Sequence, residues 1–121
     1  IEAARQAFPS GVQLVMVHVP HTYSRTQALL ERYRDAFLGL DLLVLGPIEP
    51  ARERRQPDSV RSEDVAARVV GTETVLVSSA AEAIEVVAAR VRPPAAVVCS
   101  SVRGFDRVAA GLLRRLGRGA P

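Results

Sequence analysis

The sequence predicts an α/β fold of Rossmann-like type, with a mostly parallel sheet flanked by helices on both faces. Short apolar runs rich in Val and Leu alternate along the chain with longer segments of helical periodicity. These runs are apolar at almost every position, as in strands that are buried on both faces. The 121 residues are 48% hydrophobic and contain no linker-like tract, so we expect one domain over residues 1–121.

Four strands are expected, each bounded by turn-forming or polar residues. They cover residues 13–19, 42–45, 74–77 and 95–99. Gly11 precedes the first strand, and Pro93 and Pro94 precede the last, so both strands begin where a helix does not continue.

Helices are expected before, between and after these strands. They cover residues 1–8, 25–40, 62–71, 80–91 and 105–116. In the second helix, apolar residues recur on one stripe from Leu29 to Leu40. Ser62 and Ser79 are placed to cap the third and fourth helices, and Ser79 forms a capping-box pattern with Glu82. Because the first helix begins at once, we expect the chain to be a fragment of a longer protein.

Composition narrows the classes of partner. The formal net charge is +3, and all 16 basic residues are Arg, which alternate with Asp and Glu. A nucleic-acid surface predicts a basic stripe with interleaved aromatic residues, and only 4% of the chain is aromatic. The single Cys99 excludes an internal disulfide, and no apolar run approaches the roughly 18 residues of a membrane span. We therefore expect a cytoplasmic protein that binds neither nucleic acid nor a membrane.

The richest polar segment follows the first expected strand. In a parallel sheet, ligands bind beyond the carboxyl ends of the strands. That edge comprises residues 20–24, 46–59, 78–79 and 100–104. The first of these segments offers an imidazole at His21 and hydroxyls at Thr22, Tyr23 and Ser24, and Arg25 follows in the first turn of a helix. An arginine there adds a bidentate partner for a carboxylate or phosphate to backbone N–H groups that favour anions.

Other polar residues have structural interpretations. His18 lies in an apolar run and is expected to be a buried histidine whose hydrogen bonds are satisfied. Glu49, Arg52 and Glu53 are expected to form a local ion-pair set, which contributes little at a surface. Cys99 ends a strand and is expected to behave as an inert small hydrophobe. The sequence predicts neither a catalytic nucleophile nor a metal site.

Three segments resemble parts of the C-terminal domain of the Mur ligases. Residues 17–26, Val-His-Val-Pro-His-Thr-Tyr-Ser-Arg-Thr, precede a helix with Leu29 and Phe37. The family pattern is an aromatic residue and Gln, then Pro-His-Arg/Thr-Tyr-Ser/Thr-Arg-Thr. Pro-Ala-Arg-Glu at residues 50–53 resembles the family's Tyr-Pro-Ala-Arg/Gly-Glu, and Ser-Glu-Asp at residues 62–64 resembles a later helix start. Within the family, the pattern is most similar to that of the ligases that join L-alanine to UDP-N-acetylmuramate in peptidoglycan synthesis.

The resemblance implies a domain that closes over a central ATPase domain. ATP and Mg²⁺ would be bound mainly by that central domain, where the incoming amine attacks an acyl phosphate of UDP-N-acetylmuramate. By position, Arg25 would hold a carboxylate, His21 would line the same pocket, and Tyr23 and Ser24 would shape the loop. Such roles are positioning and charge stabilisation rather than nucleophilic catalysis. The secondary candidates for this site are Thr22, Glu49, Arg52 and Arg103.

Several family features are replaced in this sequence. His18 and Val19 stand where the family has an aromatic residue and Gln, and Pro-Ile-Glu at residues 47–49 replaces Asp-Ile-Tyr. Ser-Val-Arg-Gly-Phe at residues 101–105 replaces a Gly-rich turn, and the chain has no phosphate-binding Gly-x-x-x-x-Gly-Lys motif. This chain alone is therefore not an ATP-dependent ligase. Two alternatives stay open: a degenerate domain that acts as an interaction or regulatory module without catalysis, and a general nucleotide- or sugar-phosphate-binding domain.

Overall fold

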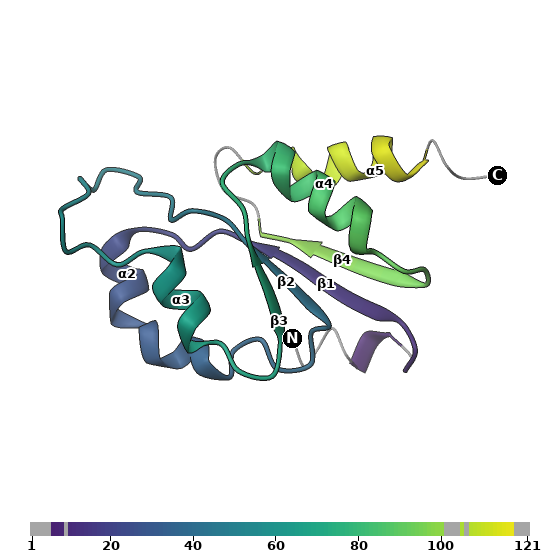
Figure 1. Cartoon of the computed structure of the whole chain (residues 1–121), viewed down its shortest axis with the longest axis horizontal. Coiled ribbons are helices and arrows are strands. Elements are labelled where there is room, and N and C mark those ends of the chain that lie inside the picture. Colours follow the sequence, from purple (N-terminus) through teal and green to yellow (C-terminus); the bar gives the residue numbers. More distant parts are fainter. Residues whose placement is uncertain (1–5, 9, 101–104, 106, 118–121) are drawn as a thin grey trace.

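The computed structural model describes residues 6–8, 10–100, 105 and 107–117, and its centre is a four-stranded parallel sheet (Figure 1). The strands are β1 (Gln13–His18), β2 (Leu42–Leu45), β3 (Glu73–Leu76) and β4 (Ala95–Cys99). Their order across the sheet is β3-β2-β1-β4, and every neighbouring pair is parallel. The predicted fold class is confirmed, and the four predicted strands are present within one residue of their expected ends.

The register brings the carboxyl ends of the strands to one edge of the sheet. His18 of β1 pairs with Leu45 of β2, Leu45 pairs with Leu76 of β3, and Val17 pairs with Cys99 of β4. The chain runs outward from β1 to β2 and β3 and then crosses to β4 on the other side of β1. In such sheets the ligand crevice lies where the strand order reverses, which is here between β1 and β4.

Helices cover both faces of the sheet, as predicted (Figure 1). The helical elements are α2 (Tyr23–Ala28), the 3₁₀ helix η1 (Leu30–Arg34), α3 (Ser62–Arg68), α4 (Ala80–Arg90) and α5 (Val108–Gly117). On the face of α4 and α5, Val15 and Val17 of β1 share a buried cluster with Val87. Alternate side chains of β1 point to the opposite face of the sheet. On that face, Leu14 packs in a cluster with Phe37.

The predicted helix over residues 25–40 is wrong in its bounds. α2 begins two residues earlier, at Tyr23, and ends at Ala28, and η1 follows it. The break lies at Leu29, whose N–H contacts the carbonyl groups of both Arg25 and Gln27. Leu30 and Tyr33, three residues apart, pack in the same apolar cluster. The three-residue turn of a 3₁₀ helix places both side chains on that side.

Ser62 does not cap α3, contrary to the prediction. It is the first helical residue, and its buried hydroxyl donates to the carbonyl oxygen of Gly46 at 2.5 Å. The N-cap is Arg61, whose N–H donates to the carboxylate of Asp64 at 2.8 Å. The Ser62 hydroxyl thus satisfies the buried carbonyl group of Gly46 just beyond β2, and the helix is capped instead by Asp64, its third residue.

The predicted cap of α4 is confirmed, because the Ser79 hydroxyl accepts the N–H of Glu82 at 3.1 Å. The last helix begins at Val108 rather than at residue 105. Phe105 instead packs against Gly46, where an added Cβ would lie 2.8 Å from the ring. Of the helix expected over residues 1–8, only residues 6–8 are described, and residues 6 and 7 are helical.

Candidate functional site

The loops that follow β1 and β2 at the carboxyl edge are joined by backbone hydrogen bonds. The ladder between β1 and β2 continues past the sheet, because the N–H of Gly46 donates to the carbonyl of His18 at 2.9 Å. The N–H of Glu49 then donates to Pro20 at 2.9 Å, and the N–H of Thr22 donates back to Glu49 at 2.7 Å. Residues 20–22 and 46–49 therefore lie side by side, as an extension of the sheet.

A carboxylate from the second loop sits at the N-terminus of α2. Oε1 of Glu53 accepts the N–H of Tyr23 at 2.5 Å and the N–H of Ser24 at 3.0 Å, and its Oε2 lies in a short hydrogen bond with the Ser24 hydroxyl. The hydrogen bond from the Ser24 hydroxyl, then those from the backbone, together with the nearby charge of His21, hold the pKa of Glu53 below its ordinary value. The carboxylate is thus held in its ionised form.

Thr22 caps the same helix from a strained backbone conformation. Its Oγ1 accepts the N–H of Arg25 at 3.2 Å, and its carbonyl accepts the hydroxyl of Thr26 at 2.7 Å and the N–H of Thr26 at 3.2 Å. Its φ is 62° and its ψ is 149°, a region that a β-branched residue rarely adopts. Four hydrogen bonds at one residue, counting its own N–H, hold this conformation in place.

These contacts correct one part of the sequence-based expectation for α2. Its first-turn N–H groups were expected to favour an external anion. In the structure they donate to Glu53, to the hydroxyl of Thr22 and to the carbonyl of Thr22. What remains for a ligand at this helix is the side chain of Arg25.

Arg25 and His21 lie together, as the site prediction requires. Both side chains are exposed, and both line a hollow of about 520 Å³. The other lining residues are Thr22, Ser24, Ala28 and Leu29. Among the described residues, no carboxylate pairs with the guanidinium of Arg25. A free cation beside an imidazole, at the wall of an open hollow, suits a carboxylate or phosphate that arrives from solvent.

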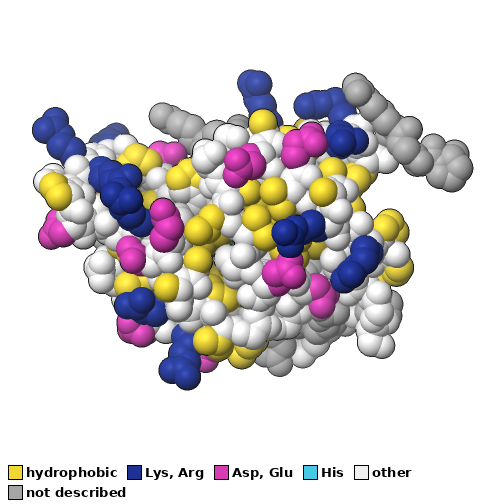
Figure 2. Space-filling view, viewed as in Figure 1, with side chains coloured by type: hydrophobic (Ala, Val, Ile, Leu, Met, Phe, Trp, Pro, Cys, Tyr) yellow, Lys and Arg dark blue, Asp and Glu magenta, His cyan; other side chains and the backbone are white. Residues whose placement is uncertain are grey.

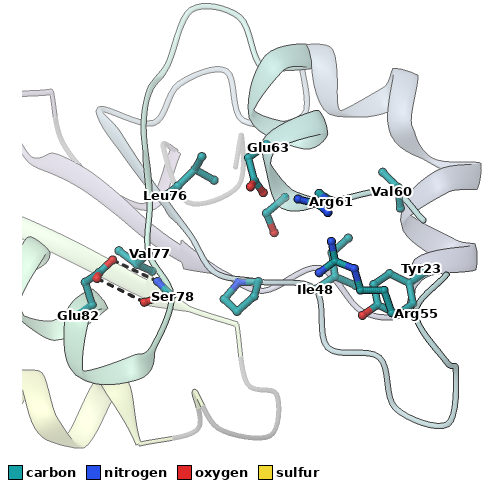
Figure 3. Close-up of a pocket in the computed structure, with 12 residues that line it drawn as sticks. Tyr23, Ile48, Arg55, Val60, Arg61, Glu63, Leu76, Val77, Ser78 and Glu82 are labelled. Atoms are coloured by element: carbon teal, nitrogen blue, oxygen red, sulfur yellow. Dashed lines mark hydrogen bonds between the residues drawn. The ribbon is translucent and has the colours of Figure 1, made fainter. Parts of the chain in front are cut away.

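Tyr23 points to a different hollow from its neighbours. It lines a space of about 410 Å³ between the starts of α3 and α4. Figure 3 shows Tyr23, Ile48 and Arg55 at one end of this space and Ser78 and Glu82 at the other. Tyr23 also packs against the apolar cluster that contains Leu30 and Ile48, so it anchors the start of α2 to the body of the domain.

The expected ion-pair set of Glu49, Arg52 and Glu53 does not form. The Glu49 carboxylate accepts the N–H of Ala51 at 3.0 Å, and Glu53 is occupied at α2. Arg52 is exposed and pairs with no acid in the described part of the chain. Both carboxylates accept hydrogen bonds from backbone N–H groups that otherwise lack acceptors, and these bonds stabilise the fold more than a surface ion pair does. Arg103 lies outside the described residues.

His18 is half-buried rather than fully buried, and its ring nitrogens, which are buried, lack the expected hydrogen bonds. The buried Nδ1 and Nε2 atoms have no partner among the described residues. The ring lies among aromatic side chains, with its centroid 5.5 Å from that of Phe37 and 6.3 Å from that of Tyr33. Burial lowers the pKa of His18, because the charged form is poorly solvated there. The expectation failed because an aromatic neighbourhood, rather than a polar one, surrounds this position.

Ser100 joins the ends of β4 and β1 by two hydrogen bonds. Its hydroxyl accepts the N–H of Val19 at 3.0 Å, and its N–H donates to the carbonyl of Val17 at 2.8 Å. Cys99 is half-buried against the core, and burial raises the pKa of its thiol, which keeps it protonated. Residues 101–104, which follow, lie outside the described residues.

The described residues carry no group of three or more His, Cys, Asp and Glu side chains with the geometry of a metal site. None of their helices combines the length and apolar character that a membrane crossing requires. Figure 2 shows Arg side chains interspersed with Asp and Glu over one face of the molecule, rather than gathered in a stripe.

Sequence reasoning missed the function of Glu53 at α2. The residue lies 29 and 30 positions from the helix amides that it contacts, so no local pattern marks it. The one available signal was the Pro-Ala-Arg-Glu segment, which resembles a second family motif, and that signal identifies the residue without its partner.

No protein-family model matches the chain. Curated relatives named UDP-N-acetylmuramate–L-alanine ligase do match it. The ligase of Chloroflexus aggregans is 34% identical over 119 residues, which are 98% of this chain and 25% of the relative. That of Lactobacillus delbrueckii subsp. bulgaricus is 40% identical over 75 residues, or 62% of this chain and 17% of the relative. That of Streptococcus suis is 41% identical over 69 residues, or 57% and 15%.

The chain is a distant homologue of these ligases. It spans a quarter or less of the length of each of these relatives. The match to the Chloroflexus aggregans ligase takes in nearly the whole chain, so the homology extends over the sheet and its carboxyl edge.

Proposed function

We propose that the chain is the C-terminal domain of a UDP-N-acetylmuramate–L-alanine ligase, and that Arg25 holds a substrate carboxylate there. Residues 1–121 form in this proposal one domain of a longer cytoplasmic enzyme of peptidoglycan synthesis. The homology to these ligases supports the assignment. The observation that carries the role of Arg25 is its guanidinium, which pairs with no carboxylate of the described residues and shares an open hollow with His21.

The position of Arg25 is itself an argument for a ligand. It is the third residue of α2, where the helix dipole favours an acid and disfavours a cation. The third residues of α3 and α4 are Asp64 and Glu82, in agreement with that preference. A cation kept at an unfavourable position, without a partner in the described chain, is explained when its partner is a bound anion.

The chemistry of this domain is binding and orientation. A guanidinium binds a carboxylate through two parallel hydrogen bonds, which fixes the direction of the amino group that must attack. His21 lines the same wall and offers a further polar contact. The described residues do not fit ATP or Mg²⁺, because they hold neither an acidic cluster nor a Gly-rich phosphate loop. In this proposal both are held by a central domain outside the chain, together with UDP-N-acetylmuramate.

The test is Arg25→Ala in the full-length protein. We expect ADP release that depends on L-alanine to fall at least about tenfold in kcat/KM, because a charge-assisted contact is lost. Arg32→Ala is the matched control, since Arg32 is also exposed but lies on η1, away from the hollow. If both variants turn over like the parent protein, Arg25 does not hold the substrate.

A second candidate function is an interaction or regulatory module that has kept the fold without catalysis. The observation that favours it is the self-sufficiency of α2, whose first-turn N–H groups are all occupied from within the chain. The gene decides between the two candidates. A preceding phosphate-binding Gly-x-x-x-x-Gly-Lys segment supports the ligase, and a protein without it supports the module.

A further inference from the structure

We infer that Glu53 is a positioning residue of the same site, which clamps the start of α2 so that Arg25 presents its guanidinium to the hollow. The kinetic consequence of this inference rests on the proposed function. The clamp itself does not, because it is a contact between a loop and the start of α2 within this chain.

The geometry of the clamp is specific. The Glu53 carboxylate receives the N–H groups of Tyr23 and Ser24, at 2.5 and 3.0 Å, and also bonds to the Ser24 hydroxyl. These are the two residues directly before Arg25 in the chain. A carboxylate that receives two adjacent helix amides fixes both peptide planes, so it also fixes the direction in which the next side chain leaves the helix.

The chain explains why this acid must come from a distant loop. In α4, the third helical residue is Glu82, and its carboxylate accepts the N–H of Ser78 just before the helix. In α2, the third residue is Arg25, so the helix has no acid of its own in its first turn. Glu53 supplies the missing negative charge from the 46–61 loop, which leaves the third position of α2 to a cation.

The 46–61 loop is also held close to the site at a second point. Glu49 is joined to residues 20–22 by backbone hydrogen bonds of 2.9 and 2.7 Å. Glu53 lies four residues further on, and its side chain makes the next contact with the first loop. The clamp therefore closes a small ring of chain around the residues that precede Arg25, and opening it frees the start of α2 while the ladder stays intact.

The experiment compares Glu53→Ala and Glu53→Gln in the full-length protein. Glu63→Ala is the matched control, because Glu63 is an exposed acid at the same edge that lines the other hollow. For Glu53→Ala we expect the peptide covering residues 20–29 to exchange its amide hydrogens at least about tenfold faster. We expect the KM for L-alanine to rise about tenfold while kcat changes less than about threefold, since the reacting groups are untouched. Glu53→Gln keeps one acceptor oxygen, so its exchange rate and its KM are expected to lie between those of the parent protein and those of Glu53→Ala.

Two outcomes overturn the inference. Exchange of residues 20–29 that is the same in Glu53→Ala as in Glu63→Ala excludes the clamp, whatever the enzyme activity. Faster exchange with an unchanged KM, in a protein whose Arg25→Ala variant is impaired, excludes the positioning role. The proposed function fails separately, when Arg25→Ala itself leaves the reaction with L-alanine unchanged.

Discussion

α2 and α4 begin at the same edge of the sheet, but the carboxylates at their N-termini come from different distances along the chain. Both have a hydroxyl at the N-cap that accepts the N–H of the third helical residue, from Thr22 in one and Ser79 in the other. At α4 the acid is local, because the Glu82 carboxylate accepts hydrogen bonds from the N–H and the hydroxyl of Ser78. At α2 the acid comes from Glu53, about 30 residues away. The start of α4 is therefore encoded within the five residues 78–82, and the start of α2 depends on a loop that is distant in sequence.

The difference extends to the surroundings of each helix. The α2 side carries a threonine at positive φ, a cation at the third helical position and, in β1, a histidine whose nitrogens have no partner in the described part of the chain. At α4, the N-cap Ser79 has extended backbone angles and the first turn carries an acid. Departures from local preference gather where a protein binds ligands, because function is retained at the expense of stability. Substitutions on the α2 side that remove these departures from local preference test this interpretation.

The largest effect is expected from His18→Phe, which replaces a ring whose nitrogens have no partner among the described residues by an aromatic ring without polar atoms. Removing buried polar atoms without partners is expected to raise the free energy of unfolding by about 1–3 kcal/mol. The measurement is urea denaturation at pH 7, with Met16→Leu on the same face of β1 as a volume-conserving control. A loss of stability in His18→Phe would show that the ring makes a favourable contact instead.

The same variant carries a pH dependence. The pKa of His18 is lowered in the folded protein, so the unfolded chain takes up the proton first as the pH falls. Stability is then lost between the ordinary histidine pKa of 6.5 and the lower folded value. We expect the parent protein to lose stability below about pH 6.5, and His18→Phe to lose less of it.

An intermediate effect is expected from removing the two caps. Ser79→Ala is expected to destabilise the protein by about 1 kcal/mol, as at an ordinary N-cap. Thr22→Gly loses the same kind of hydrogen bond, but glycine adopts the backbone angles of 62° and 149° without strain. Its net change is expected to be within about 0.5 kcal/mol of zero. Chemical denaturation of both variants measures the contrast, and equal losses would mean that Thr22 is not strained.

The smallest effect is expected from Arg25→Gln. Removing a cation from the first turn is expected to stabilise the protein by about 0.3–1 kcal/mol, and glutamine suits the third helical position. If Arg25 holds the substrate carboxylate as proposed, the same change weakens binding of L-alanine, so stability and function move in opposite directions. Arg32→Gln on η1 serves as the control in both the denaturation and the binding measurement. A destabilised Arg25→Gln would place a favourable partner for Arg25 inside the protein.

These contrasts show which parts of the molecule the sequence could reveal. The strands were predictable because runs such as residues 42–45 and 95–99 are apolar between clear breaks. The cap at Ser79 was predictable because its partners lie within four residues. The helix break at Leu29 and the hydrogen bond of the Ser62 hydroxyl were not predictable, since both depend on contacts with elements that are distant in sequence.

The candidate site divides in the same way. His21 and Arg25 were predicted as neighbours, and one loop and one turn of helix bring them to the same hollow. Tyr23 was grouped with them but points elsewhere, because a helix start turns successive side chains by about 100°. Glu53 was assigned to a surface ion pair, since nothing near it in the sequence identifies the amides of α2 as its partners.

The 46–61 loop has an inner part, residues 46–53, and an outer part, residues 54–59, which differ in how they tolerate a change of length. Residues 46–53 are held in register with residues 18–24, so an added residue there would shift every contact along the extended ladder. In residues 54–59 the hydrogen bonds are internal, between Gln56 and Ser59. Among natural variants of this domain, insertions and deletions therefore belong in the outer part, and the inner part keeps its length.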